Sequence, residues 1–361
     1  REPDRIERFA QRPDFQDKFR RADIYSSVDE ICHADLDAVV LMTQPWLHAP
    51  QAIQLLDAGK HVYSAVPVIS LPDVQEVLEW CDRLVAACQR SGRHYMLGET
   101  TIYRPQTMFC RRQAAAGAFG SFVYAEGEYV HPFDSPGCDL RQVQAARGAS
   151  KAGREWAALQ QIYRTRGVKG TPMTYPTHSV SGPMSVMRCH ALKVAALGTR
   201  PASSDSFFAD YAFSNVSAFF QMSNGVGMRI CEYREAAYPG SAGFEHETFR
   251  VFGTQGTFRE NTWMVRDRFE KLTAAQMRDP LPPDVAAAWR DEKGESVMYG
   301  GHGGSHAYLV HEFVDAIATG RRPAINAWEA CRYMAAGCAA QRSALHDGEW
   351  TSVPDWGDAP A

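Results

Sequence analysis

Asp37–His48, with the sequence DAVVLMTQPWLH, decides the fold of this chain. Its first half is short, apolar and rich in β-branched residues, which is typical of a strand buried on both faces of a parallel sheet. Working outward, residues 50–58 predict a helix that Gly59 ends, and His61–Tyr63 predicts the next strand. The residues that follow each strand should lie at the edge where parallel sheets bind ligands.

A second helix is predicted from near Pro72, with Ser70 as a candidate N-cap and Gly92 at its end. Its apolar residues recur every three or four positions and form one stripe: Val74, Val77, Leu78, Cys81, Leu84, Val85 and Cys88. A third strand, His94–Leu97, completes a strand–helix–strand–helix–strand unit, which predicts a parallel sheet. Segments 43–48, 64–68 and 98–105 should therefore line one cleft.

The pattern changes from mixed to alternating near Gly120. Residues 122–130 alternate, and two hairpins are predicted within residues 215–233 and 249–258. Residues 134–170 are polar and Arg-rich and predict an irregular or helical excursion, and helices over 305–319 and 327–345 close the chain. The fold class is therefore α/β: a Rossmann-type parallel-sheet domain over 1–98, lacking its first β-α-β elements, and an α+β domain over 99–361. The second domain should contain a large, mostly antiparallel, open-faced sheet, with the C-terminal helices packing back on the first domain.

The composition narrows the class of protein. A length of 361 residues favours two domains, and the mixed charges, with a net charge of −4, argue against nucleic acid as a partner. No apolar run approaches the roughly 20 residues that span a membrane, and the charged first residues do not form a secretory signal. Nine cysteines without a CxxC pair predict reduced thiols in a cytoplasmic protein.

One expected motif is missing from the first hundred residues. A dinucleotide-binding domain should open with a strand, a glycine-rich turn and a helix, yet the only early glycines are Gly59, Gly92 and Gly98. Either the sequence begins downstream of that turn, or the domain does not bind a nucleotide.

Asp37–Pro50 and Ala58–Tyr63 closely resemble the Gfo/Idh/MocA family, which includes glucose–fructose oxidoreductase and inositol dehydrogenase. The turn Gly253–Thr257 and the ending His311–Pro323 extend the resemblance along essentially the whole chain. It implies that Arg1 follows the second Rossmann strand, so that the glycine loop would precede it. It also implies NAD or NADP as cofactor, held by Thr43, Gln44, Pro45, Trp46, His48, Ser64 and Pro67.

Two departures from the family pattern change the expected chemistry. Ala65-Val66-Pro67 stands where the family often has Glu-Lys-Pro, and Thr174 stands where it has an aspartate four residues before the histidine. Because valine can neither donate nor accept a proton, other groups must assist proton transfer. Tyr175–His178 (YPTH) and Glu99–Tyr103 (ETTIY) resemble a subset without that lysine, the NAD-dependent α-N-acetylgalactosaminidases. Such enzymes oxidise a sugar hydroxyl transiently, eliminate the glycosidic substituent and return the hydride.

The predicted catalytic residues are His178, Tyr175 and Glu99. Pro176 predicts a helix beginning beside His178, and a helix N-terminus disfavours the imidazolium, so we expect a neutral ring that acts as base. Tyr175 would donate to a sugar oxygen, and Glu99 would orient the sugar or remove a carbon-bound proton. The alternative is a core histidine bonded to backbone and a glutamate in an ion pair at a strand end.

Further residues were weighed as substrate contacts or metal ligands. Three residues are candidate substrate contacts: Tyr103, Tyr163 and Arg164. Tyr103 would form part of the wall of the site, and Tyr163 and Arg164 could equally belong to a solvated face. His302–His306, with His311, has no fixed ligand spacing and no paired carboxylate, so a tight turn is predicted and no metal.

The sequence therefore predicts an NAD(P)-dependent oxidoreductase that acts on a secondary hydroxyl of a sugar, sugar derivative or cyclitol. An NAD-dependent glycosidase or lyase and a non-catalytic sugar- or nucleotide-sensing protein remain alternatives. The open sheet face predicts a homo-oligomer, either a dimer or a tetramer.

Overall fold

The computed structural model describes residues 3–12, 20–134, 140–237, 246–291, 293, 294 and 296–360, with side chains from residue 6 onward. Arg1, at which a truncated start was predicted, and Cys138 lie outside the described residues. The other eight cysteines are free thiols. Within the described chain, no helix is both long and apolar enough to cross a lipid bilayer.

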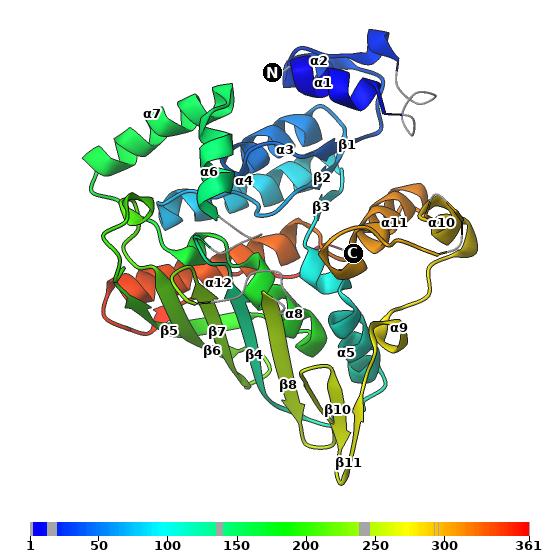
Figure 1. Cartoon of the computed structure of the whole chain (residues 1–361), viewed down its shortest axis with the longest axis vertical. Helices are drawn as coiled ribbons and strands as arrows, with labels where there is room; N and C mark the ends of the chain where they lie inside the picture. Colours follow the sequence, from blue (N-terminus) through cyan, green and yellow to red (C-terminus); the bar gives the residue numbers. More distant parts are fainter. Residues whose placement is uncertain are drawn as a thin grey trace.

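The predicted parallel sheet is confirmed. Strands β1 (Ala38–Leu41), β2 (His61–Ser64) and β3 (Tyr95–Leu97) run parallel in the order β1-β2-β3. The prediction that the first strand is buried on both faces is wrong, because β1 is an edge strand of this sheet and the Val40 side chain is 59% exposed. Helices α3 (His48–Asp57) and α4 (Val74–Ser91) pack against each other beside the sheet (Figure 1).

Helix α4 follows the predicted apolar stripe. Val77, Leu84 and the other residues of the stripe are buried, apart from the half-buried Val74 at the first turn. Asp73, rather than Ser70, caps the helix, because its carboxylate accepts from the backbone N–H of Gln75. Gly92 ends the helix in the left-handed conformation, at φ +65°.

The second sheet has nine strands in the order β11-β10-β9-β8-β4-β7-β6-β5-β12. Neighbouring strands are antiparallel, except that β4 and β7 run parallel to each other. The strands are β4 (Phe122–Val130), β5 (Ala191–Thr199), β6 (Asn215–Met222), β7 (Gly227–Tyr233), β8 (Glu247–Gly253), β9 (Thr257–Arg259), β10 (Thr262–Val265), β11 (Arg268–Lys271) and β12 (Thr351–Ser352). The predicted hairpins are confirmed, and a mostly antiparallel sheet domain follows the Rossmann-type sheet as expected.

One face of the large sheet is covered by helices and the other is open. Helix α8 (Thr177–Met187) packs on β4, β7 and β8, and α12 (Ala327–Leu345) packs on β5 (Figure 1). On the open face, Tyr124 stacks on Phe219 with 6.4 Å between ring centroids, and Phe219 is 47% exposed. Strand alternation thus produces a buried apolar face and a face that carries aromatic and charged side chains.

Helix α12 also joins the two sheets, since it packs against α4 and β3 as well. Helices α6 (Leu140–Gly148) and α7 (Lys151–Thr165) form an arm that reaches the first domain (Figure 1). The arm is pinned to α4, where Arg166 forms ion pairs with Asp73 and Glu76 and the Tyr163 hydroxyl donates to Glu76 at 2.6 Å. The remaining helices are α1 (Pro3–Ala10), α2 (Val28–His33), α5 (Pro105–Ala115), α9 (Ala274–Met277), α10 (Pro283–Ala288) and α11 (His306–Ala318).

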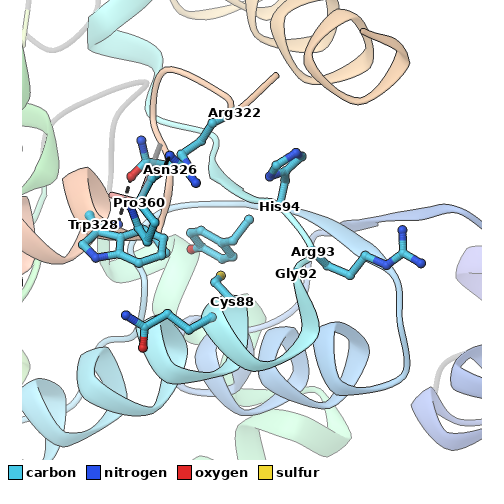
Figure 2. A pocket seen from close by; sticks show the side chains of 11 residues that line it. Cys88, Gly92, Arg93, His94, Arg322, Asn326, Trp328 and Pro360 are labelled. Atoms are coloured by element: carbon cyan, nitrogen blue, oxygen red, sulfur yellow. Dashed lines mark hydrogen bonds between the residues drawn. The ribbon is translucent and has the colours of Figure 1, made fainter. Parts of the chain in front are cut away.

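A small cavity of about 200 Å³ lies where α4 ends and β3 begins. Figure 2 shows Gly92, His94, Arg322 and Trp328 around it. This cavity borders the amino end of β3. The carboxyl end of the same strand leads instead to Glu99, in the predicted cleft.

Candidate active site

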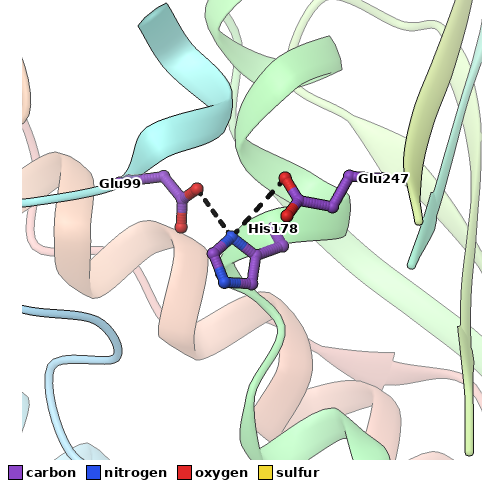
Figure 3. Close-up of side chains that lie close together, drawn as sticks. All are labelled: Glu99, His178 and Glu247. Carbon is purple, nitrogen blue, oxygen red and sulfur yellow. Dashed lines mark hydrogen bonds and ion pairs between the residues drawn. The ribbon is translucent and has the colours of Figure 1, made fainter. Parts of the chain in front are cut away.

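Three buried titratable side chains meet behind the carboxyl end of β3 (Figure 3). Glu99 follows β3, His178 lies in the first turn of α8, and Glu247 begins β8. The His178 Nδ1 lies 2.9 Å from Glu99 Oε1 and 3.7 Å from Glu247 Oε2. His178 is only 7% exposed, so these carboxylates dominate its surroundings.

The cluster is an ion pair, and its pKa values follow from that. Burial would lower the pKa of His178, but the charges of Glu99 and Glu247 outweigh burial and raise it to about 9. Burial would raise the pKa of Glu99, but His178, Thr177 and the backbone N–H of Thr101 lower it to about 2. The prediction that a helix N-terminus keeps His178 neutral is therefore wrong, because two nearby carboxylates outweigh the helix dipole.

Besides His178, Glu247 contacts two residues that directly follow the first domain, Thr101 and Arg104. The Thr101 hydroxyl donates to Glu247 Oε2 at 2.6 Å, and Arg104 Nη2 lies 2.8 Å from Glu247 Oε1. The sequence analysis did not identify Glu247, because no local motif marks it. Glu247 follows His178 by 69 positions in the sequence, but the two side chains lie close together in space.

A second acid–base pair, Tyr129 and His131, was also missed. The Tyr129 hydroxyl lies 2.5 Å from His131 Nδ1, and the Tyr129 ring lies 4.9 Å from the His178 ring, centroid to centroid. Burial, together with the charges of Arg234 and His246, lowers the pKa of His131 to about 3. The signal was available: residues two apart on a strand share a face, so Tyr129 and His131 had to lie together.

A buried network supports this second pair. Arg234 lies over the Tyr129 ring, with 5.0 Å from its guanidinium carbon to the ring centroid, and donates to Glu232 at 2.9 Å. The Ser179 hydroxyl, next to His178, donates to the other oxygen of Glu232 at 2.5 Å. Burial raises the pKa of Glu232 to about 7 in spite of these partners. The network joins α8 to β7 directly beneath the site.

The predicted cofactor residues gather at the carboxyl ends of β1 and β2. His48 bridges the two loops, since its ring nitrogens lie 2.8 Å from the Pro67 carbonyl oxygen and 3.1 Å from that of Thr43. The Thr43 hydroxyl donates to Gln51, and the Ser64 hydroxyl donates to the Ala65 carbonyl oxygen. Gln44 remains half-buried and Pro45 is buried. Trp46 stacks on Trp156 of the arm, with 4.7 Å between ring centroids.

Tyr175 links the site to the position where the family lysine is replaced. Its hydroxyl donates to the carbonyl oxygen of Val66 at 3.2 Å, and its ring lies 5.3 Å from that of His178. The phenol is therefore positioned at the interface of the two domains, rather than free to donate as the sequence predicted.

The predicted substrate residues do not join this cluster in the described contacts. Tyr103 packs under the guanidinium of Arg111, at 5.5 Å from the ring centroid. Tyr163 bonds Glu76, and Arg164 forms a two-pronged ion pair with Asp210. Tyr163 therefore fixes the arm, whereas Arg164 lines a separate cavity beneath it.

The donor atoms of Glu99, His178 and Glu247 all lie within 4.8 Å of one another, which is close enough for a metal ion. However, because the pKa of His178 is raised, a metal ion would have to displace a proton from this ring in order to bind there. Elsewhere, His302 Nδ1 lies 3.0 Å from His306 Nε2, and the Gly301 N–H donates to His306 Nδ1, as expected of a tight turn.

A parallel, Rossmann-type sheet joined to an open-faced sheet, with a buried acid–base cluster between them, defines a class of two-domain protein. Comparison with known proteins identifies the class more closely. Residues 2–99 match the model of the oxidoreductase family with an NAD-binding Rossmann fold, Gfo/Idh/MocA. The family resemblance read from the sequence is therefore confirmed.

Similar proteins extend the match to the second domain. The chain is 30% identical over 158 residues to glycosyl hydrolase family 109 protein 2 of Bacteroides fragilis strain YCH46, which covers 43% of this chain but only 32% of that protein. It is 23% identical over 352 residues to an alpha-N-acetylgalactosaminidase of Tannerella forsythia, covering 88% of this chain and 70% of the relative. A crystal structure of aldose-aldose oxidoreductase from Caulobacter crescentus, complexed with glycerol, matches 98% of this chain and 89% of its own. Its TM-score is 0.66 at 15% identity, which shows a shared fold.

Proposed function

We propose that the chain is an NAD(P)-dependent oxidoreductase that acts on a secondary hydroxyl of a sugar, sugar derivative or cyclitol. One observation carries the proposal: two histidines, His178 and His131, flank the same tyrosine, Tyr129, in surroundings that shift their pKa values in opposite directions. When a hydride leaves an alcohol carbon, the hydroxyl proton must leave too, and the oxygen must be stabilised. The two imidazoles supply these two roles in one site.

The residues at the ends of β1 and β2 fit a nicotinamide nucleotide. Ligands bind outside the carboxyl ends of parallel strands, and His48 fixes the two loops there through their carbonyl oxygens. Thr43 is exposed and Gln44 is half-buried, so both side chains are accessible at that edge. When bound, the nicotinamide supplies the hydride acceptor.

The chain's own groups divide the proton chemistry between them. The imidazole of His131 is neutral and accepts the substrate proton through the Tyr129 hydroxyl, which lies 2.5 Å from Nδ1. The imidazolium of His178 donates a hydrogen bond where negative charge develops, and the carboxylates of Glu99 and Glu247 keep it protonated. Val66 stands at the position of the family lysine and has no titratable side chain. The Tyr175 hydroxyl donates to its carbonyl oxygen and so fixes the backbone there.

A second candidate is cleavage of a glycoside by transient oxidation and elimination. Such a reaction needs more proton-transfer groups than simple oxidation, because a carbon-bound proton leaves and the departing oxygen gains one. The two adjoining centres, Glu99–His178–Glu247 and Tyr129–His131, favour it. The names of the relatives from Bacteroides fragilis and Tannerella forsythia point the same way.

The two candidates are separated by the product. The purified chain is incubated with NAD⁺ or NADP⁺, first with free sugars and cyclitols and then with aryl glycosides. Net NADH or NADPH production at 340 nm with free sugars supports the oxidoreductase, whereas release of the phenol without net reduction supports the glycosidase. Absence of both, with nucleotide binding retained, supports the sensing protein instead.

We also propose that a second copy of the chain covers the open sheet face, where Tyr124, Phe219 and the exposed Leu197 lie. Size-exclusion chromatography with light scattering tests this proposal, and a monomer at micromolar concentration contradicts it. The free thiols fit a reducing compartment, and we propose the cytoplasm.

A further inference from the structure

A separate cavity of about 450 Å³ lies between the α6–α7 arm and the two domains. Its walls include Trp46 and Pro72 from the first domain, Arg147 and Trp156 from the arm, and Thr174 and Tyr211 from the second domain. The volume falls within the roughly 300–1,000 Å³ that is usual for small-molecule sites. Apart from Trp46, which was predicted to hold the cofactor, none of these residues takes part in the chemistry assigned above.

The lining carries an excess of positive charge. Its charged residues are Arg147, Arg154, Arg164 and Asp210. Arg164 donates two hydrogen bonds of 2.6 and 2.9 Å to Asp210, so the charges of this guanidinium and of the carboxylate cancel. Arg147 and Arg154 have no acidic partner within the described part of the chain. A negatively charged ligand would form ion pairs with Arg147 and Arg154.

The other wall residues are typical of a sugar site. Trp46 and Trp156 present a stacked pair of indoles, and Phe207 and Tyr211 form a second stacked pair with 5.7 Å between centroids. Gln144, Ser70 and Ser206 add hydrogen-bonding groups to the same lining. Flat aromatic faces with a few polar groups suit a ring that has an apolar side and a rim of hydroxyls.

Two chain segments contribute residues both to the cavity and to the neighbourhood of the acid–base cluster. Thr174 immediately precedes Tyr175, whose ring lies 5.3 Å from that of His178, and Trp46 lies two residues before His48. The arm that closes the cavity is fixed to α4 by Arg166 and Tyr163.

We propose that the cavity binds a second sugar unit of the substrate, one that carries a carboxylate or a phosphate. This inference rests on the proposed function, because it assumes that the first sugar unit occupies the His178 cluster. Arg147 and Arg154 bind the anionic group, and the indoles of Trp46 and Trp156 stack on the ring.

Calorimetric titration of the whole chain with three small probes tests this without turnover. The probes are methyl glucuronide, glucose 6-phosphate and methyl glucoside, which separate the carboxylate, the phosphate and the neutral sugar. At least one anionic probe should bind about tenfold or more tightly than methyl glucoside, as a charge-assisted hydrogen bond requires. Arg147→Gln should abolish that preference, and Trp156→Leu should weaken all three probes.

Two further variants identify the site that is measured. Arg268→Gln, on the exposed strand β11, removes the same charge elsewhere and should leave the preference unchanged. Glu99→Gln alters the acid–base cluster and should also leave it unchanged, so a failure of the proposed reaction is distinguishable from a failure of this site. The proposal is overturned if neither anionic probe binds, if all three bind equally, if Arg147→Gln keeps the preference, or if Glu99→Gln abolishes it.

Discussion

His178 and His131 face the same tyrosine ring but carry opposite charge states. His178 lies against the carboxylates of Glu99 and Glu247, and its pKa is raised to about 9. His131 is buried near Arg234 and His246, and its pKa is lowered to about 3. The difference shows what decides which imidazole is the acid and which is the base: burial lowers the pKa of both rings, and only His178 has carboxylates close enough to outweigh it.

The largest expected effect comes from removing the carboxylate nearest to His178. Glu99→Gln should lower turnover by about 10²- to 10⁴-fold, because burial then dominates and the pKa of His178 falls below 9. Steady-state rates measure it, with whichever sugar or glycoside the product assay identifies as a substrate. Glu79→Gln, on the exposed side of α4, is the matched control. If Glu99→Gln keeps the wild-type rate, the reaction does not need different charge states of His178 and His131.

The next effect concerns the tyrosine between the two histidines. Tyr129→Phe should reduce turnover by about 10- to 100-fold, since it removes the hydroxyl that connects substrate to His131. Tyr124→Phe, on the opposite face of the same strand, should leave the rate unchanged. Equal rates for the two variants would separate Tyr129 from the chemistry.

A smaller effect is expected from the cation that keeps His131 neutral. Arg234→Met should raise the pKa of His131 and move the acid limb of the rate profile to higher pH, with a rate loss of about tenfold or less that is confined to the acid side of the profile. Arg234→Lys keeps the charge and should keep the acid limb in place. Identical profiles for the two variants, each shown to be folded by circular dichroism, would mean that Arg234 acts only through packing.

The smallest effect is on stability. The raised pKa of His178 stabilises the folded state fully below the unfolded value of 6.5, and this contribution is lost as pH rises through about 9. The lowered pKa of Glu99 stabilises above 4.5, and this contribution is lost as pH falls through about 2. The melting temperature of wild type should therefore exceed that of the Glu99→Gln, His178→Gln double variant by a few degrees between about pH 4.5 and 6.5. A constant difference from pH 5 to pH 10 would contradict this linkage.

Much of the fold followed from local sequence pattern. The apolar stripe from Val77 to Cys88 and the strand Ala38–Leu41 were readable because helices and buried strands have distinct periods. Pro176 marked the start of the helix that carries His178.

The candidate site was only partly readable, because its residues come from distant segments. Glu99 and His178 were found through short motifs, whereas Glu247 pairs with them only through the register of β8 beside β4. The charge of His178 depends on both carboxylates at once, so no rule about its own helix could give it. Tyr129 and His131 were the avoidable omission, since His131 directly follows β4 and lies two residues after Tyr129, so an extended chain places them on one face.

The charge of His178 tests the account most directly. A pH titration of the imidazole resonances by NMR, with ¹⁵N-labelled histidine and His178→Gln for assignment, measures its pKa. The account predicts a protonated ring at pH 7 that titrates near 9, while the His131 ring stays neutral down to well below pH 5. A His178 ring that is neutral at pH 7 and titrates at or below its ordinary value would contradict the assignment of acid and base.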